Sequence, residues 1–346
     1  MSRRSRRVQA WATVFRQLSD GLMSGMPLPD LIAVIKRSSN AVLACGGLVD
    51  DLARASRGDM AVHEAMARQV DLLPSAGLVA EAEQLGLLPQ AFDLLAYDWE
   101  DQDAWLKDLS QVLAWPAVLL ACLFLLTIVI MVFVIPAFKE VFFSFGSELP
   151  GPTLFFLAVS ELWVRHGALA TVALGVAGWV VWRRRGLLMR SAWLDGALRR
   201  LPGVRAVIEG RFYARLGRMA LLSAESHLPF ASAVRYLGAS TPLHGLAQDA
   251  TRVAQALDAG LTPAEALQQS LPALGNLTVA LAIAAHSAQP GALLLRVVLG
   301  LEQELRARRA RLERAITLLT YVGVGSVLGI FVIAMYLPIF KLGAVV

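Results

Sequence analysis

The chain has 346 residues, of which 56% are hydrophobic and only 17% are charged. Soluble domains carry about 25% charged residues, so this composition excludes a disordered chain and an ordinary soluble enzyme. It predicts membrane spans joined to folded soluble regions. The net charge is +5, and it is uneven: residues 1–112 hold 11 basic and 15 acidic groups, whereas residues 183–314 hold 18 basic and 9 acidic groups.

The first 112 residues have a helical pattern. Trp11, Phe15, Leu18 and Leu22 recur every three to four residues, which is typical of one face of an amphipathic helix. A turn around Gly25 then ends this helix. No alternating β-pattern of convincing length occurs here or later in the chain. We therefore predict an all-α protein in which residues 1–112 form a first helical bundle.

Three apolar runs are candidates for membrane-spanning helices, at residues 113–136, 164–182 and 316–338. A helix needs about 20 residues to cross the hydrocarbon core. The first and third runs contain no charged residue, and the second is weaker because Arg165 and His166 lie at its edge. The alternative for each run is a buried core helix.

Basic flanks predict the orientation of these spans. Arg183–Arg185 follow the second run, and five arginines between Arg306 and Arg314 precede the third. The loop at residues 137–163 has one lysine against three glutamates. We expect residues 1–112 and a second bundle at residues 183–315 to be cytoplasmic, and the loop and a C-terminal tail at residues 339–346 to lie on the outer side.

An offset of 202 residues relates the two halves of the chain, which indicates an internal repeat. The matching positions are Arg16 and Arg218, Pro27 and Pro229, Gly58 and Gly260, Glu100 and Glu302, and the segments Pro136–Lys139 and Pro338–Lys341. Each copy is then a cytoplasmic bundle followed by one outward span. The second span returns the chain to the cytoplasm, so that both copies share one orientation.

Several segments resemble the inner-membrane platform proteins of type II secretion and type IV pilus assembly. They are FVIPAFKEVFFSFGSELPGPT at residues 133–153, AMYLPIFKL at residues 334–342, the block from Arg16 to Pro27, and Ala82-Glu83 followed by Gly86. The resemblance covers nearly the whole chain and includes the order, the duplication and the topology of its parts.

The resemblance implies a non-enzymatic scaffold in the bacterial inner membrane, with two cytoplasmic six-helix bundles. It also implies partners: a hexameric cytoplasmic assembly ATPase, pilin or pseudopilin subunits, other inner-membrane assembly proteins, and further copies of the chain. Candidate motif or partner-contact residues follow from the paired segments. They are Arg16, Pro27, Glu83, Gly86, Pro136, Arg218, Pro229 and Pro338.

The second copy departs from the first at two motif positions. His227 stands where the first copy has Gly25, and Ala285-His286 stands near where it has Ala82-Glu83. If the carboxylate contacts a partner, only Glu83 can do so.

No pattern for catalysis, cofactor or metal binding occurs. The chain lacks a phosphate-binding GxxxxGK[ST] loop, and its histidines lack the spacing of a zinc site. The basic cluster before the third run is explained by topology and anionic lipid, so no nucleic acid is expected. A transporter or channel component is the alternative function, disfavoured because the spans lack ionisable groups at depth. A receptor is disfavoured by the short outer loop.

The acidic run Asp98–Asp108 approaches the first span and leaves two interpretations open. It is either a solvated helix face or an electrostatic docking surface for the arginine-rich second bundle of another copy. No glycine or proline interrupts residues 92–114 or 302–321, so we expect the last helix of each bundle to continue into its span.

Overall fold

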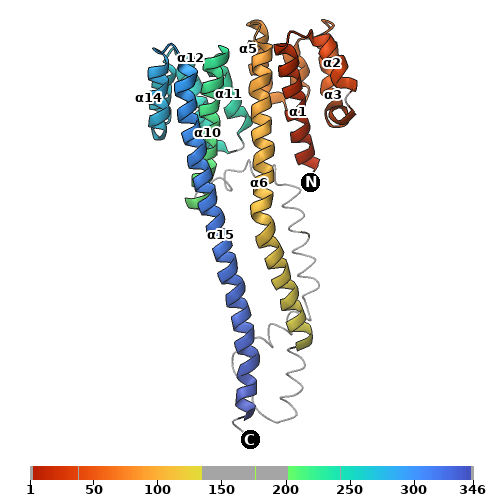
Figure 1. Ribbon diagram of the computed structural model, residues 1–346, viewed down its shortest axis with the longest axis vertical. Coiled ribbons are helices and arrows are strands. Elements are labelled where there is room, and N and C mark those ends of the chain that lie inside the picture. Colours follow the sequence, from red (N-terminus) through yellow and green to blue (C-terminus); the bar gives the residue numbers. More distant parts are fainter. Residues whose placement is uncertain (1–2, 38, 135–175, 177–201, 242, 344–346) are drawn as a thin grey trace. The chain divides into compact units, whose positions relative to one another are not determined.

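The computed structural model describes residues 3–37, 39–134, 176, 202–241 and 243–343 (Figure 1). Within these ranges the chain is all-helical, and no strand occurs. The predicted fold class is therefore confirmed at the level of secondary structure.

The first half contributes six α-helices and one short 3₁₀ turn, which we call bundle 1. Their order is α1 (Arg3–Met23), α2 (Leu28–Arg37), α3 (Ser39–Ala55), α4 (Val62–Ala67), η1 (Leu73–Ser75), α5 (Ala76–Gln84) and the first turns of α6 (Leu88–Val129). The aromatic side chains of Trp11 and Phe15 on α1 stack toward Trp99 and Phe92 on α6, with ring centroids 5.9–6.4 Å apart. This cluster joins the two helices through a dry core.

The second half repeats this order of elements, and we call it bundle 2. Its helices are α10 (Pro202–Ser226), α11 (Phe230–Ser240), α12 (His244–Asp258), α13 (Pro263–Ser270), η3 (Pro272–Leu274), α14 (Gly275–Ala284) and the first turns of α15 (Pro290–Gly343). A Cβ at Gly217 on α10 would lie 3.0 Å from Leu301 on α15. The two helices thus approach closely where bundle 1 has the bulky Phe15.

The turns predicted from glycine are present. Gly58 and Gly260 have φ of +85° and +89°, and each follows a helix with the paired backbone hydrogen bonds of a Schellman C-cap. Gly25 ends α1 in the same way, with φ of +84°. His227, at the matching place after α10, has φ of +59° and is the one described non-glycine residue with positive φ.

The two bundles share packing within one compact unit, which comprises the described residues up to Asp108 and those from residue 202 to Ala310. Met219, Leu228, Ala233 and Tyr236 of bundle 2 belong to the buried core cluster of bundle 1. In this unit α11 packs against α5 and η1. The two predicted bundles therefore meet through an apolar contact as well as through charges.

The second unit contains the remaining parts of α6 and α15, and both are strongly apolar. Among the described residues, two stretches are long and apolar enough to cross a membrane, Ala114–Val134 and Pro290–Ile333. Within the first stretch, the most apolar 18 residues have no side chain buried inside the structure. Trp115 Nε1 donates to the hydroxyl of Tyr321 at 3.2 Å, so an aromatic pair links the two helices.

Both long helices run from a bundle into an apolar stretch without interruption, as the lack of helix breakers predicted (Figure 1). Pro116 lies inside α6, just within the apolar stretch, where it removes one helical hydrogen bond. A π-helical turn, Ile130–Val134, follows α6. The predicted loop at residues 137–163, and the second span at 164–182 apart from Val176, lie outside the described residues.

Candidate functional site

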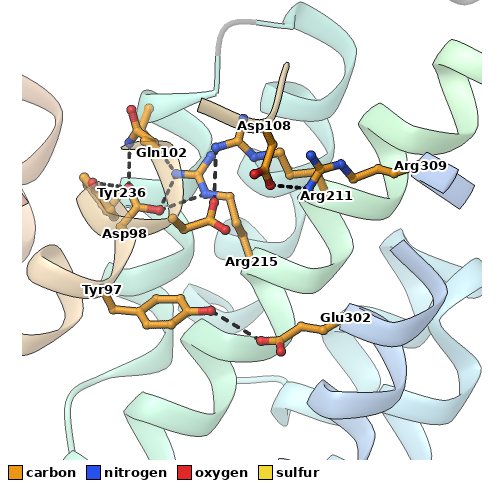
Figure 2. A network of polar contacts seen from close by, with 11 residues as sticks. Tyr97, Asp98, Gln102, Asp108, Arg211, Arg215, Tyr236, Glu302 and Arg309 are labelled. Carbon is orange, nitrogen blue, oxygen red and sulfur yellow. Dashed lines mark hydrogen bonds and ion pairs between the residues drawn. The ribbon is translucent and has the colours of Figure 1, made fainter. Parts of the chain in front are cut away.

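A buried polar network joins α6 of bundle 1 to α10 and α11 of bundle 2 (Figure 2). At its centre is Asp98, whose side chain is 1% exposed. Arg215 Nε donates to Asp98 Oδ1 at 2.8 Å, and Arg215 Nη2 lies 2.7 Å from the same oxygen. Tyr236 donates its hydroxyl to Asp98 Oδ2 at 2.6 Å, and Gln102 Nε2 donates there at 3.0 Å. The remaining Arg215 contact is to Ser240 Oγ at 3.1 Å.

This network satisfies the charges that it buries. Desolvation acts to lower the pKa of Arg215, but Asp98, Tyr236 and Asp101 together outweigh it, and the net pKa is raised. Burial, together with the same carboxylate, raises the pKa of Tyr236 well above its ordinary value. The guanidinium stays charged and the phenol stays a hydrogen-bond donor, so the arrangement keeps its form across the physiological pH range.

Further contacts extend the network along α6 to α10 and to α15. Arg211 Nη2 lies 3.1 Å from Asp101 Oδ2, and Arg309 Nη1 lies 2.8 Å from Asp108 Oδ2. Both guanidinium groups sit over the Trp105 ring, at 4.5 and 4.9 Å from its centroid. Helix α6 therefore presents three carboxylates and one indole ring to the arginines of bundle 2.

These contacts decide between the two interpretations of the acidic run. Asp98 is buried, Asp101 and Asp108 are partly exposed, and the arginine partners of all three belong to the second bundle of the same chain. The expectation of docking onto another copy was wrong for these carboxylates. Asp103 instead pairs with Lys107 on its own helix.

Arg16 and Arg218 occupy matching places in the two bundles, and each pairs with the glutamate found at the same offset. Arg16 Nε and Nη2 donate to the two oxygens of Glu100 at 2.9 and 2.8 Å. Arg218 Nη2 lies 3.4 Å from Glu302 Oε1, and its guanidinium stacks on Tyr97 at 4.5 Å. Tyr97 in turn donates to Glu302 at 3.3 Å. Each arginine thus ties the first helix of its bundle to the last.

Glu83 caps the N-terminus of α4. Its carboxylate accepts the backbone N–H groups of Val62 at 2.9 Å and His63 at 3.3 Å, and it lies 2.8 Å from His63 Nδ1. Burial acts to raise the pKa of Glu83, but these hydrogen bonds and the His63 ring outweigh it and lower the pKa. Glu83 therefore performs a structural task from α5, 20 residues along the chain.

Bundle 2 caps the equivalent helix locally. Thr262 accepts the N–H of Glu265, and the Glu265 carboxylate accepts the N–H of Thr262, which is a capping box at the start of α13. In bundle 1 the N-cap residue of α4 is Ala61, which has no hydroxyl. Glu83 supplies the missing acceptor, which explains physically why bundle 2 can lack a carboxylate at the matching site.

Comparison with known proteins shows which family this chain resembles. Residues 216–338 match the family described as "Type II secretion system (T2SS), protein F". The chain is 25% identical over 345 residues to the type IV pilus assembly protein TapC of Aeromonas hydrophila, covering 97% of this chain and 82% of that protein. The chain is thus similar to the T2SS F and PilC-like family.

Two further relatives in the T2SS F and PilC-like family give similar coverage. The type 4 fimbrial assembly protein PilC of Pseudomonas putida is 26% identical over 340 residues, which is 96% of this chain and 83% of that protein. The type IV pilus assembly protein PilC of Pseudomonas aeruginosa is 23% identical over 272 residues, covering 78% and 72%. The match spans both bundles, so the resemblance seen in the sequence is confirmed.

The other candidate residues act through the backbone where the structure describes them. Gly86 has φ of +71° and ends α5 in a Schellman C-cap, with Leu87 N–H donating to the Ala82 carbonyl at 2.7 Å. Pro27 and Pro229 precede α2 and α11, and each carbonyl accepts the N–H four residues later. Pro136 lies outside the described residues. Helix α15 continues through Pro338 to Gly343.

Sequence reasoning missed the residues that hold the two bundles together, above all Arg211, Arg215 and Tyr236. A signal for the arginines was present, because Arg211, Arg215 and Arg218 recur at the spacing of one helix face. Among the described residues, no group of three or more His, Cys, Asp or Glu side chains could hold a metal ion.

Proposed function

We propose that this chain is the inner-membrane platform of a type IV pilus or type II secretion machine, coupling a hexameric cytoplasmic assembly ATPase to polymerisation of pilin or pseudopilin subunits. The observation that carries the proposal is the match to pilus assembly proteins over 96–97% of the chain. This role needs no catalytic group in the chain itself, because the ATPase would supply the chemical energy.

The proposed organisation has two duplicated cytoplasmic bundles and three spans, with the N-terminus inside and the C-terminus in the periplasm. Two features support the duplication. The six helices follow the same order in each half, and the pairs Arg16–Glu100 and Arg218–Glu302 recur at a constant offset. Two spans, an even number, separate the bundles in this organisation, which keeps both bundles in one compartment, and the third span follows bundle 2. The second span, predicted at residues 164–182, is the returning helix.

Continuity of the long helices supports a mechanical role. Force applied to a bundle can reach the membrane along α6 or α15, since each contains the last helix of its bundle and an apolar stretch. The ion-pair network between α6 and α10 would make the two bundles respond together rather than separately. Pilin subunits in the membrane would then meet a platform driven as a single body.

Copurification of the full chain in detergent with the candidate assembly ATPase tests the proposal. We expect the ATPase to bind the wild-type chain, and deletion of the gene to abolish pili or secretion. The role would be refuted if the ATPase did not bind the wild-type chain and if pili and secretion were unchanged after deletion of the gene. Reporter fusions after residues 100 and 250 test the topology separately: we expect both on the cytoplasmic side, and opposite sides would exclude the duplicated arrangement.

A further inference from the structure

The contact between the bundles is formed by a different face of each. Bundle 1 contributes α5, η1 and α6, whereas bundle 2 contributes α10, α11 and the side of α15 that carries Glu302 and Arg309. The two bundles have the same order of helices. Each bundle therefore has a second face, built from the helices that correspond to those used by the other bundle in the contact. The α14, η3 and α15 face of bundle 2 corresponds to the docked face of bundle 1. The α1 and α2 face of bundle 1 corresponds to the docked face of bundle 2.

These two remaining faces have lost the charges of the internal contact. At the constant offset, Asp98 corresponds to Gly300, Arg215 to Thr13, and Tyr236 to Val34. All three members of the buried triad are therefore replaced together. The change removes a charge from each side, so that neither face is left with an unmatched half of the pair.

Both faces instead expose apolar side chains. On the α14 and α15 face, Val279 and Ile283 are 58% and 53% exposed and lie one helical turn apart, and Leu299 is 41% exposed. On the α1 and α2 face, Val34 is 55% exposed and Met26 is 38% exposed. Exposed apolar side chains do not stabilise the bundle that carries them, and groups of them often mark an interaction site. Their presence on both remaining faces indicates that the two faces bind each other.

Charge on the two faces is also complementary. Arg296 is exposed on α15, one turn before Gly300. Asp20 and Asp30 are exposed on α1 and α2. A contact between the faces would bring opposite charges to the rim of an apolar centre, which is the usual arrangement of a protein–protein interface.

We infer that the α14–α15 face of one copy docks onto the α1–α2 face of another copy, repeating between chains the contact that joins the bundles within a chain. The contact is heterologous, since the two partners contribute different surfaces. The inference rests on the equivalence of the two bundles, which forms part of the organisation proposed above. Bundles 1 and 2 of successive copies would then alternate along the assembly.

Cysteine cross-linking of the full chain tests this contact. Cys122 is replaced by alanine, and Cys45 is retained because it is buried and burial raises its thiol pKa to about 12. Two differently tagged versions are coexpressed, one with Val34→Cys and one with Ile283→Cys, and are treated in membranes with a short bismaleimide. We expect a cross-link that carries both tags, and none in membranes that contain either version alone.

Two outcomes overturn the inference. Absence of the mixed cross-link excludes the contact, and efficient cross-linking of Val34→Cys or Ile283→Cys to itself indicates a symmetric interface instead. Val70→Cys coexpressed with Ile283→Cys is the matched control, because Val70 is 87% exposed but lies on neither face. This control should give no cross-link.

A substitution experiment supplies a second, independent measurement. Val34→Asp or Ile283→Asp should weaken self-association in detergent about tenfold or more, whereas Val70→Asp should not change it. Equal effects of all three variants would overturn the inference. ATPase copurification is measured on the same preparations. If the ATPase binds but the cross-link fails, the inference is wrong and the proposed function stands.

Discussion

The Asp98–Arg215 pair provides a sharp energetic test of the contact between the bundles. Its side chains are 1% and 10% exposed, and the two groups satisfy each other together with Tyr236. Removing one partner of a buried pair leaves an uncompensated charge and costs about 3–5 kcal/mol. We therefore expect Asp98→Asn and Arg215→Met each to destabilise the contact by that amount.

The double variant should cost much less than the sum of the two single variants. Without either charge, neither group pays the desolvation penalty of an unpaired ion, and buried pairs are often replaceable by neutral groups at little cost. We expect Asp98→Asn with Arg215→Met to be destabilised by about 2–4 kcal/mol, which gives a coupling energy of about 2 kcal/mol or more. Tyr236→Phe, which removes one hydrogen bond to a charged group, should cost about 1.5–3 kcal/mol.

Hydrogen exchange of the purified full chain in detergent measures these energies locally. Peptides from α10 and α11 report the free energy of opening of the contact, without requiring two-state unfolding of the whole chain. Asp50→Asn is the control, because Asp50 pairs with Lys36 at 2.8 Å but is 70% exposed, and its loss should cost less than about 1 kcal/mol. Additive effects of Asp98→Asn and Arg215→Met would refute the reasoning.

Three further predictions follow from the helix ends and the paired arginines. Glu83→Gln should destabilise bundle 1 by about 1 kcal/mol in urea unfolding, and Ala61→Thr should restore the cap. Because folding lowers the Glu83 pKa, its contribution is present above the ordinary carboxyl pKa of about 4.3 and is lost as pH falls through the folded pKa, so the effect of Glu83→Gln should shrink in acid. His227→Gly should raise stability by about 1 kcal/mol, since it relieves a positive φ, and an unchanged melting temperature would contradict this. Arg218→Lys should lower the protection of α10 against hydrogen exchange by about tenfold, because lysine cannot both stack on Tyr97 and pair with Glu302; unchanged protection would count against that role.

Local pattern was sufficient to predict the helices and their ends. The spacing of Trp11, Phe15 and Leu18 identified the buried face of α1, and Gly58 and Gly260 identified C-caps, because both signals act over one or two helical turns. The offset of 202 residues also identified the arginine and glutamate positions that pair in each bundle. It did not show that they pair with each other.

The sequence did not predict which residues far apart in the chain contact each other. Asp98 lies 117 residues from Arg215, and opposite charge alone does not distinguish a contact within one chain from a contact between two. Glu83 resembled a surface motif, because nothing in the sequence shows that α4 begins with an alanine that lacks a capping oxygen. Both outcomes depend on which helices meet, and that is a property of the tertiary fold.

The distribution of charge distinguishes the contact between the bundles of one chain from the proposed contact between two copies. If α10 of one copy docked onto the α15 face of another, Arg215 would lie opposite Gly300 and would be buried without a carboxylate. Conversely, Asp98 docked onto α1 would face Thr13. Each wrong pairing leaves one unpaired buried charge, and such a penalty excludes alternatives more effectively than additional attraction would. The buried ion pair therefore matches an α6 face to an α10 face and leaves the apolar faces for a partner without matching charges.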